Sequence, residues 1–192
     1  ATILGQVVPD ALGMLSPKLR HRLQVVQQCR PDDIEAVRNR YAALNIPANL
    51  STYIADMPSE LAEAHLVIGR AGASTIAELT AAGRPAILIP LLIATDDHQT
   101  ANAREMAKAG GARMIPQTEF TPEVLAKQIE AIAGDPQALT NAAERALSVG
   151  RPHATSDLAD LIERIAGGKS PLLVGPAEPV SNPALGGMGV PA

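Results

Sequence analysis

The chain has 192 residues, of which 46% are hydrophobic and 2% aromatic, and it carries a formal net charge of −4. This length gives room for one domain with an aliphatic core, while the acidic balance and the lack of Lys or Arg runs argue against a nucleic-acid surface or a basic membrane patch. The lone Cys29 excludes an internal disulfide, so we expect it to be a small buried side chain in a reducing cytoplasm.

The first third of the chain alternates helical and strand patterns. Helices are predicted over residues 2–15, 31–44 and 56–64, and strands over 23–29 and 49–54. Asp56 has the position of an N-cap residue in the last of these helices. A helix that opens a domain of this kind normally follows a strand and a glycine loop, and none stands before residue 2. Together with the initial Ala1, this predicts a fragment, or a product cut from a longer gene, that lacks its first strand.

The most informative stretch is residues 67–99, which read VIGRAGASTIAELTAAGRPAILIPLLIATDDHQ. An apolar run over 66–68 predicts a strand, and the turn 69–72 leads to a helix over 74–82. Gly83 and Pro85 end this helix, and a second strand is predicted over 86–90. A strand–turn–helix–strand unit builds a parallel sheet, so the predicted fold class is α/β, a Rossmann-like parallel sheet flanked by helices.

The rest of the chain continues in the same way and then changes composition. After a loop over 91–97, a helix over 98–109 ends at Gly110, and a strand follows over 112–115. Thr121 is the expected cap of a helix over 122–133, and further helices are predicted over 136–149 and 153–166. From Gly167 onward Pro and Gly dominate, which predicts a domain over 1–167 and a disordered tail over 168–192.

The helix over 74–82 begins at a glycine turn, where free N–H groups favour an anion. Ser74, Thr75 and Glu78 lie on one face of this helix because they are spaced three or four residues apart, while Ile76 and Leu79 turn toward the sheet. Phosphates at the helix start and a ribose one turn further on would fit this face, because one carboxylate can accept from both ribose hydroxyls. The alternative is an ordinary helix start with a solvated glutamate.

A second polar group lies at the start of the helix over 98–109. His98 and Asn102 are one turn apart, with Gln99 beside them, and Asp96 and Asp97 are expected to cap the helix. Neutral donors and acceptors of this kind suit the hydroxyls of a sugar. The alternative is a capped surface helix with a solvated histidine.

These residues carry a family resemblance. The segments RAGASTIAELTAAGRPAILIP and DDHQTANA closely resemble the MurG family of bacterial peptidoglycan glycosyltransferases, over roughly residues 1–166. The resemblance is limited to the C-terminal, donor-binding half of the two-domain GT-B fold. It implies that the backbone of Ile54 pairs with uracil beside Tyr53, and that His98 and Gln99 contact the sugar. The complete set of donor-binding residues that it implies is Ile54, Arg70, Gly72, Ala73, Ser74, Thr75, Glu78, His98, Gln99 and Asn102.

The resemblance also implies a reaction, the transfer of GlcNAc from UDP-GlcNAc to the undecaprenyl-diphosphate-linked muramoyl-pentapeptide with inversion at the anomeric carbon. It implies no cofactor and no protein-held metal, with UDP-GlcNAc as a substrate. The catalytic base and the lipid-acceptor surface are expected in a missing N-terminal half, so this chain alone is predicted to be inactive. The whole protein is expected on the cytoplasmic face of the inner membrane.

Two other interpretations remain open from the sequence. One is the donor half of a naturally split GlcNAc transferase that acts on a polyprenyl-linked acceptor, and the other is a non-catalytic UDP-sugar-binding module. A metal site has little support, since Asp96 and Asp97 are not joined by a His or Cys cluster. The four histidines show no nucleophile spacing, which makes a catalytic triad a weak interpretation.

Overall fold

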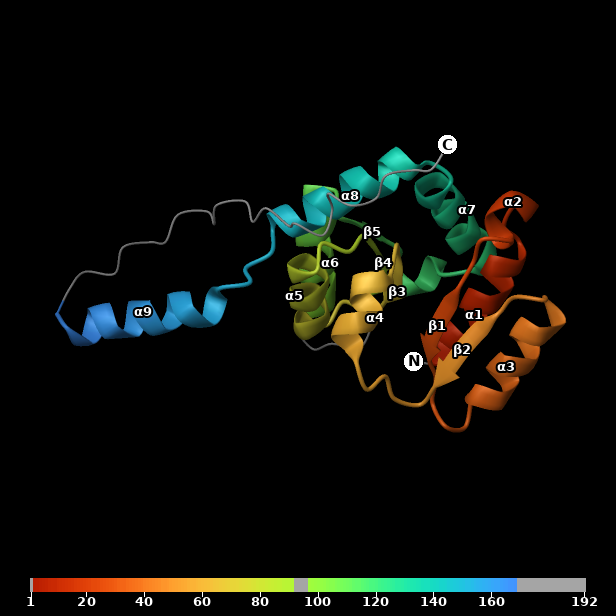
Figure 1. The fold of residues 1–192 in the computed structure, drawn as a ribbon, viewed down its shortest axis with the longest axis horizontal. Coiled ribbons are helices and arrows are strands. Elements are labelled where there is room, and N and C mark those ends of the chain that lie inside the picture. The colour runs from red at the N-terminus through yellow and green to blue at the C-terminus, as the bar shows by residue number, and fades with distance from the viewer. Residues whose placement is uncertain (1, 92–96, 169–192) are drawn as a thin grey trace.

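A computed structural model describes residues 2–91 and 97–168 of the chain. Helices and strands alternate along most of this length, and strands that are neighbours in a sheet run parallel (Figure 1). In chain order the elements are α1 Thr2–Gly13, α2 Pro17–Arg20, β1 Val25–Gln28, α3 Ile34–Ala43, β2 Ala48–Ser51, α4 Met57–Glu63, β3 Val67–Gly69, α5 Ala73–Ala81, β4 Ala86–Leu88, α6 His98–Ala109, β5 Ala112–Met114, the 3-10 helix η1 Gln117–Glu119, α7 Pro122–Ala133, α8 Pro136–Ser148 and α9 Ala154–Ala166.

The strands form two separately hydrogen-bonded parallel sheets, β1-β2 and β3-β4-β5. The sequence predicts parallel strands flanked by helices, and this fold class is confirmed. The predicted single sheet is instead divided in two. Among the described residues β1 pairs only with β2 and β3 pairs only with β4, so no hydrogen bonds join β1 to β3. Alternate residues of β4 enter different cores, as the period of two along a strand requires. Ile87 belongs to the core that also contains α1 and α7, and Leu88 to the core between β4, α5 and α6.

The core beneath α1 joins the two sheets. It holds Cys29, directly after β1, together with Ile87 and Ile89 from the β4 segment. Burial raises the pKa of the Cys29 thiol, which agrees with the predicted role of a small buried side chain. On the other face, α8 packs against α5, α6 and α7. Helices therefore cover both faces of the larger sheet, and the ends of its strands are where a ligand could approach.

Several local signals act as the sequence predicts. Asp56 caps α4 by accepting a hydrogen bond from the Ser59 N–H at 3.1 Å, and Thr121 caps α7 by accepting one from the Val124 N–H at 3.3 Å. Gly83, which follows the C-cap residue Ala82 of α5, has a φ of 62°. The end of α5 is a Schellman motif, because the N–H of Arg84 bonds to the carbonyl of Leu79.

Element boundaries differ from the predictions mainly at turns. Residues Pro31–Asp33 form a turn, so α3 begins later than predicted, and the short α2 and η1 were not predicted. Asp97 lies at the N-cap of α6 but its side chain makes no capping bond, so that prediction was wrong for its side chain. The predicted cap Asp96 and all but the first residue of the predicted tail lie outside the described residues.

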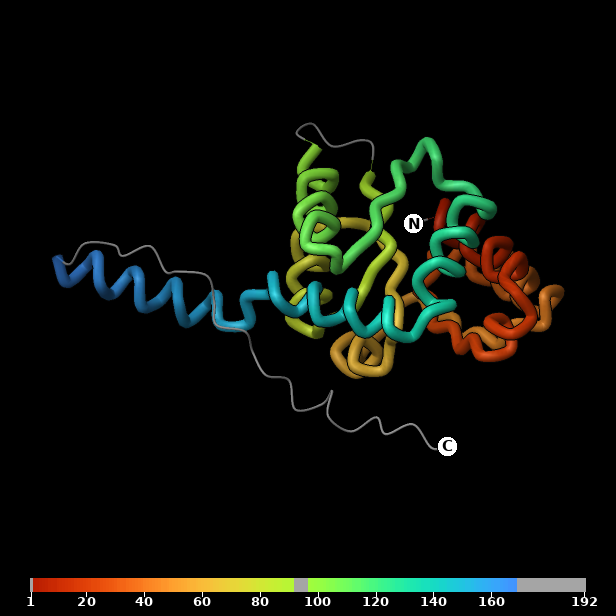
Figure 2. Tube along the Cα trace, turned by 90° about the horizontal axis from the view of Figure 1, so that it is seen from above, coloured from red at the N-terminus to blue at the C-terminus, as the bar shows by residue number. Residues whose placement is uncertain are grey.

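The helix α9 projects away from the rest of the described chain (Figures 1 and 2). Its apolar residues Leu158, Ile162 and Ile165 are each more than half exposed. The segment 149–153 connects α8 to α9. Its start is fixed, because Gly150 is buried against the backbone of Thr80 in α5. No helix of the described residues is long and apolar enough to cross a membrane.

Candidate functional site

The predicted site residues gather where β3 and β4 end. The two strands are parallel and in register, with Val67 opposite Ala86 and Gly69 opposite Leu88. Their carboxyl ends therefore meet at one edge of the sheet, which is where open α/β sheets bind ligands. The turn of Arg70, Ala71 and Gly72 leaves this edge and leads directly into α5.

The N-terminus of α5 is open. Gly72 is its N-cap residue, and no side chain caps the helix. The first intrahelical bond runs from the Ile76 N–H to the Gly72 carbonyl at 3.0 Å. The N–H groups of the first three helical residues, Ala73 to Thr75, therefore have no acceptor within the helix. Such a helix end, with its positive dipole, is suited to an anion.

Neither Gly69, the last residue of β3, nor Gly72 in the turn is required by the fold. Neither Gly69 nor Gly72 has a φ in the left-handed region. A Cβ on Gly69 would meet nothing within 4 Å, and one on Gly72 would lie 3.6 Å from Thr75 Oγ1, an ordinary contact. A methyl group at Gly72 would therefore fit without displacing its neighbours and would lie at the N-terminus of α5.

Arg70 makes contacts with the backbone that the sequence did not reveal. Its Nη1 donates to the carbonyls of Ile89 at 3.0 Å and of Pro90 at 3.2 Å, just after β4. Partial burial lowers the pKa of the Arg70 guanidinium. The side chain ties the turn after β3 to the end of β4 and places a positive charge at this edge.

Two side chains of α6 form hydrogen bonds with backbone groups at this edge of the sheet. The Leu91 N–H donates to Gln99 Oε1 at 3.0 Å, and Asn102 Nδ2 donates to the Ala71 carbonyl at 3.1 Å. The partners are backbone groups, for which side-chain patterns give no signal. The bond from Leu91 orients the Gln99 amide and uses one lone pair of its oxygen, so its N–H groups and the second lone pair can meet a ligand.

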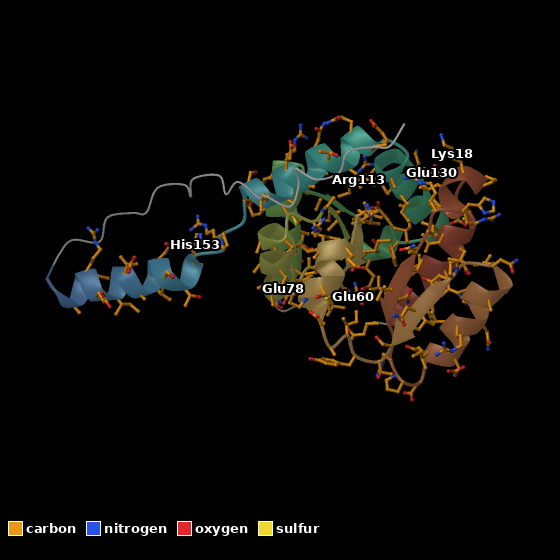
Figure 3. The ribbon with its side chains drawn as sticks, in the orientation of Figure 1. Lys18, Glu60, Glu78, Arg113, Glu130 and His153 are labelled. Carbon is orange, nitrogen blue, oxygen red and sulfur yellow. The ribbon has the colours of Figure 1, made fainter. Side chains whose placement is uncertain are left out.

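The other predicted residues are more exposed. Ser74, Glu78 and His98 are exposed, while Thr75 is half-buried near the start of α5. Glu78 projects from α5 (Figure 3), whereas the next residue, Leu79, is buried in the core. Glu78 lies on α5 and His98 at the start of α6, and these two helices pack against each other.

Ile54 and Tyr53 lie beyond the end of the other sheet, because β2 ends at Ser51 and not at residue 54 as predicted. They follow the carboxyl end of β2, where Ile54 is half-buried and Tyr53 is 74% exposed. Among the described residues there is no cluster of three His, Cys, Asp or Glu side chains that could hold a metal ion.

Two cavities lie away from these residues. One, of about 350 Å³, is lined by residues of β5, α7 and α8 that include Arg113 and Arg145 (Figure 3 labels Arg113). The other, of about 380 Å³, lies between α5, α6 and the end of α8. We place the candidate site at the strand ends instead, because the open helix N-terminus and the converging polar groups are there.

A parallel α/β domain with an open helix N-terminus at the carboxyl ends of its strands is a nucleotide-binding domain in its architecture. The chain belongs to the glycosyltransferase family 28 C-terminal domain family, whose model matches residues 1–165.

Curated relatives and a solved structure agree with this assignment. The chain is 64% identical over 90% of its length to a Novosphingobium aromaticivorans protein, and 62% identical over 87% of its length to an Erythrobacter litoralis protein. Both are named UDP-N-acetylglucosamine--N-acetylmuramyl-(pentapeptide) pyrophosphoryl-undecaprenol N-acetylglucosamine transferase. The crystal structure of Acinetobacter baumannii MurG matches 85% of the chain with a TM-score of 0.78 and 37% identity. The predicted resemblance to MurG is therefore confirmed.

The match covers only part of each relative. The chain spans 44% of the Novosphingobium protein, 42% of the Erythrobacter protein and 46% of the Acinetobacter MurG chain. A further likeness, to the glycosyltransferase VinC solved with dTDP, has a TM-score of 0.58 at 14% identity and concerns the fold alone.

Proposed function

We propose that this chain is the donor-binding part of an inverting glycosyltransferase. The whole protein would move GlcNAc from UDP-GlcNAc to the undecaprenyl-diphosphate-linked muramoyl-pentapeptide in peptidoglycan synthesis. The names of the relatives support this choice of donor and acceptor. The structural observation that carries the proposal is the open N-terminus of α5, with Ser74, Thr75 and Glu78 following it along the helix.

The diphosphate would bind at the start of α5. The N–H groups of Ala73 and Ser74 and the hydroxyls of Ser74 and Thr75 are donors at the positive end of the helix dipole. Glu78 lies one turn further along, roughly 5 Å, where its carboxylate would accept from both ribose hydroxyls. Arg70 would add positive charge beside the phosphates, and its hydrogen bonds to Ile89 and Pro90 hold it at this edge.

The ends of the donor would meet other elements. His98 and Gln99 would donate to hydroxyls of the GlcNAc ring, and the amide of Gln99 is oriented for this by its bond to the Leu91 N–H. The backbone of Ile54 would pair with the uracil edge beside the exposed Tyr53. This set of contacts needs neither a cofactor nor a metal ion held by the protein.

In the reaction, these residues would act on the leaving group. The acceptor hydroxyl attacks the anomeric carbon of GlcNAc, the bond from that carbon to the diphosphate oxygen breaks, and UDP departs with the electron pair. Donors at the start of α5 and the positive charge of Arg70 would stabilise the negative charge on UDP. The base that takes the proton from the acceptor, and the surface for the lipid-linked acceptor on the cytoplasmic side of the membrane, would belong to the part of the protein outside this chain.

A strand from that part would also complete the sheet. β1 and β3 each have one edge without a partner strand among the described residues. A strand that comes before α1 and lies between them would join the two parallel sheets into one. The core that already spans both sheets supports this arrangement.

The proposal is tested by titrating the purified 192-residue chain with UDP-GlcNAc, UDP and GDP while recording ¹⁵N-labelled backbone amides by NMR. We expect UDP-GlcNAc and UDP to bind weakly and to shift the amides of Ala73 to Glu78, and GDP to bind more weakly than UDP. A chain that shows no shifts with UDP or UDP-GlcNAc, or that binds GDP equally well, would contradict the proposed donor site.

A further inference from the structure

Asn102 is half-buried and bonds to the backbone of the turn that opens the candidate site. It lies on α6, one turn after His98, and its Nδ2 donates to the carbonyl of Ala71 at 3.1 Å. Ala71 is fully buried and comes directly before Gly72, the N-cap residue of α5. The side chain therefore joins α6 to the peptide that opens the candidate anion site.

This hydrogen bond determines where another donor points. The Ala71 carbonyl and the Gly72 N–H belong to one planar peptide, and in a trans peptide the two groups point in opposite directions. The chain has no cis peptide bond among the described residues. When Asn102 holds the carbonyl toward α6, the Gly72 N–H is turned away from α6. This N–H has no acceptor among the described residues, so it is available to a ligand.

Two neighbouring contacts make the arrangement rigid. Arg70 ties the turn to the carbonyls of Ile89 and Pro90, and Gln99 ties α6 to the N–H of Leu91. The turn after β3, the segment after β4 and the start of α6 are thus joined pairwise by three side chains. Two of these side chains, Arg70 and Asn102, hold the turn itself, which keeps its N–H groups oriented before a ligand arrives and reduces the cost of ordering them on binding.

We propose that Asn102 is a positioning residue for the diphosphate of the donor, acting through the Ala71–Gly72 peptide, and that the Gly72 N–H is a phosphate contact. This inference rests on the proposed function. It gives Asn102 a role other than the expected direct contact with the donor, because one N–H of its amide donates to the Ala71 carbonyl and so fixes the peptide before the ligand binds. The recognised chemistry is the diphosphate, rather than the sugar or the base.

The first experiment needs no variant. In the ¹⁵N-labelled chain, UDP should shift the Gly72 amide resonance strongly, whereas uridine, which lacks phosphate, should leave it in place. If UDP shifts the amides of Ser74 and Thr75 but not that of Gly72, the phosphate contact is overturned while the donor site stands. If UDP shifts none of them, the proposed function itself fails, so the two failures are distinguishable.

The second experiment compares variants with UDP and UDP-GlcNAc as ligands. Asn102→Ala should weaken UDP binding roughly tenfold, the effect of about one hydrogen bond, and should move the Gly72 amide resonance in the free chain. Asn102→Asp keeps the shape, removes the donor and adds a negative charge, so its loss should be larger. Asn39→Ala, on the exposed face of α3, is the matched control and should bind as the unmodified chain does.

The outcomes separate positioning from direct contact. A loss with UDP-GlcNAc but not with UDP would show that Asn102 acts on the sugar, and would overturn the inference. Unchanged UDP affinity in both Asn102 variants would overturn it as well. If Asn102→Ala does not fold, the isosteric Asn102→Asp and the measurement on the unmodified chain still decide the question.

Discussion

The hydroxyl of Tyr41 donates to Oε1 of Gln27 at 2.6 Å, which joins α3 to β1. Tyr41 is 2% exposed, and burial raises its pKa, so the hydroxyl stays protonated and continues to donate. We expect Tyr41→Phe to lower the free energy of unfolding by about 1–3 kcal/mol, because it leaves the Gln27 oxygen without its partner. Urea unfolding measures this loss. The other tyrosine, Tyr53, is 74% exposed, and Tyr53→Phe should change stability by no more than about 0.5 kcal/mol.

Leu79 and Ile162 provide a matched pair for the packing of helices. Leu79 is 1% exposed in the core between β4, α5 and α6, whereas Ile162 is 57% exposed on α9. Leu79→Ala should therefore cost about 2–5 kcal/mol of unfolding free energy, measured by denaturant unfolding. Ile162→Ala should leave it nearly unchanged. A comparable loss for Ile162→Ala would show that α9 packs on the domain in solution.

Gly150 and Gly72 differ in what surrounds them. A Cβ on Gly150 would lie 2.7 Å from the backbone oxygen of Thr80, whereas on Gly72 the nearest atom would be Thr75 Oγ1 at 3.6 Å. We expect Gly150→Ala to destabilise the chain by about 1–3 kcal/mol, because the backbone of α5 must shift. Gly72→Ala should melt like the unmodified chain and bind UDP more weakly. Equal melting temperatures for the two variants would contradict the close packing at Gly150.

The capping carboxylate of α4 makes stability depend on pH. The Ser59 side chain and then its backbone N–H donate to Asp56 and hold the pKa of that carboxyl below its usual range. Its contribution is present above the ordinary pKa of about 3.9 and is lost as pH falls through the lowered value. Asp56→Asn keeps a capping oxygen that does not titrate, so its melting temperature should fall less between about pH 5 and pH 2. Asp160→Asn on α9 is the control, and parallel curves for Asp56→Asn and the unmodified chain would refute the prediction.

Glu78 is the residue on which the ribose assignment depends. Glu78→Gln should weaken UDP-GlcNAc binding by about 1.5–3 kcal/mol, because a carboxylate that accepts from two hydroxyls is replaced by an amide with one acceptor oxygen. In the whole enzyme most of this effect should appear in the donor KM, since the ribose is bound in the ground state and in the transition state. The melting temperature should not change, because Glu78 is exposed.

The ligand series supplies the control for this variant. UDP analogues that lack the 2′-hydroxyl should lose less from Glu78→Gln than UDP-GlcNAc does, because one of the two proposed hydrogen bonds is already absent. Glu144→Gln, exposed on α8, should bind as the unmodified chain. If Glu78→Gln binds UDP-GlcNAc normally, Glu78 is a surface glutamate and the ribose assignment is wrong.

The sequence by itself determined the features that depend on neighbouring residues. The limits of α6, the caps Asp56 and Thr121 and the helix-ending Gly83 agree with the prediction. Each of these is decided within a few residues, since a cap accepts from an N–H two or three positions away and a left-handed residue ends a helix wherever it occurs. The family resemblance was likewise contained in one continuous stretch and a short motif after it.

Only the tertiary structure decided what the polar side chains at the strand ends contact. Asn102 and Ala71 are 31 residues apart, and Arg70 and Ile89 are 19 apart. Their pairing depends on where α6 packs beside the turn, and the partners are backbone groups that have the same chemistry at every residue. The division of the strands into two sheets and the outward direction of α9 are decided in the same way. Strand pairing and helix packing are long-range contacts, which the local pattern of side chains does not specify.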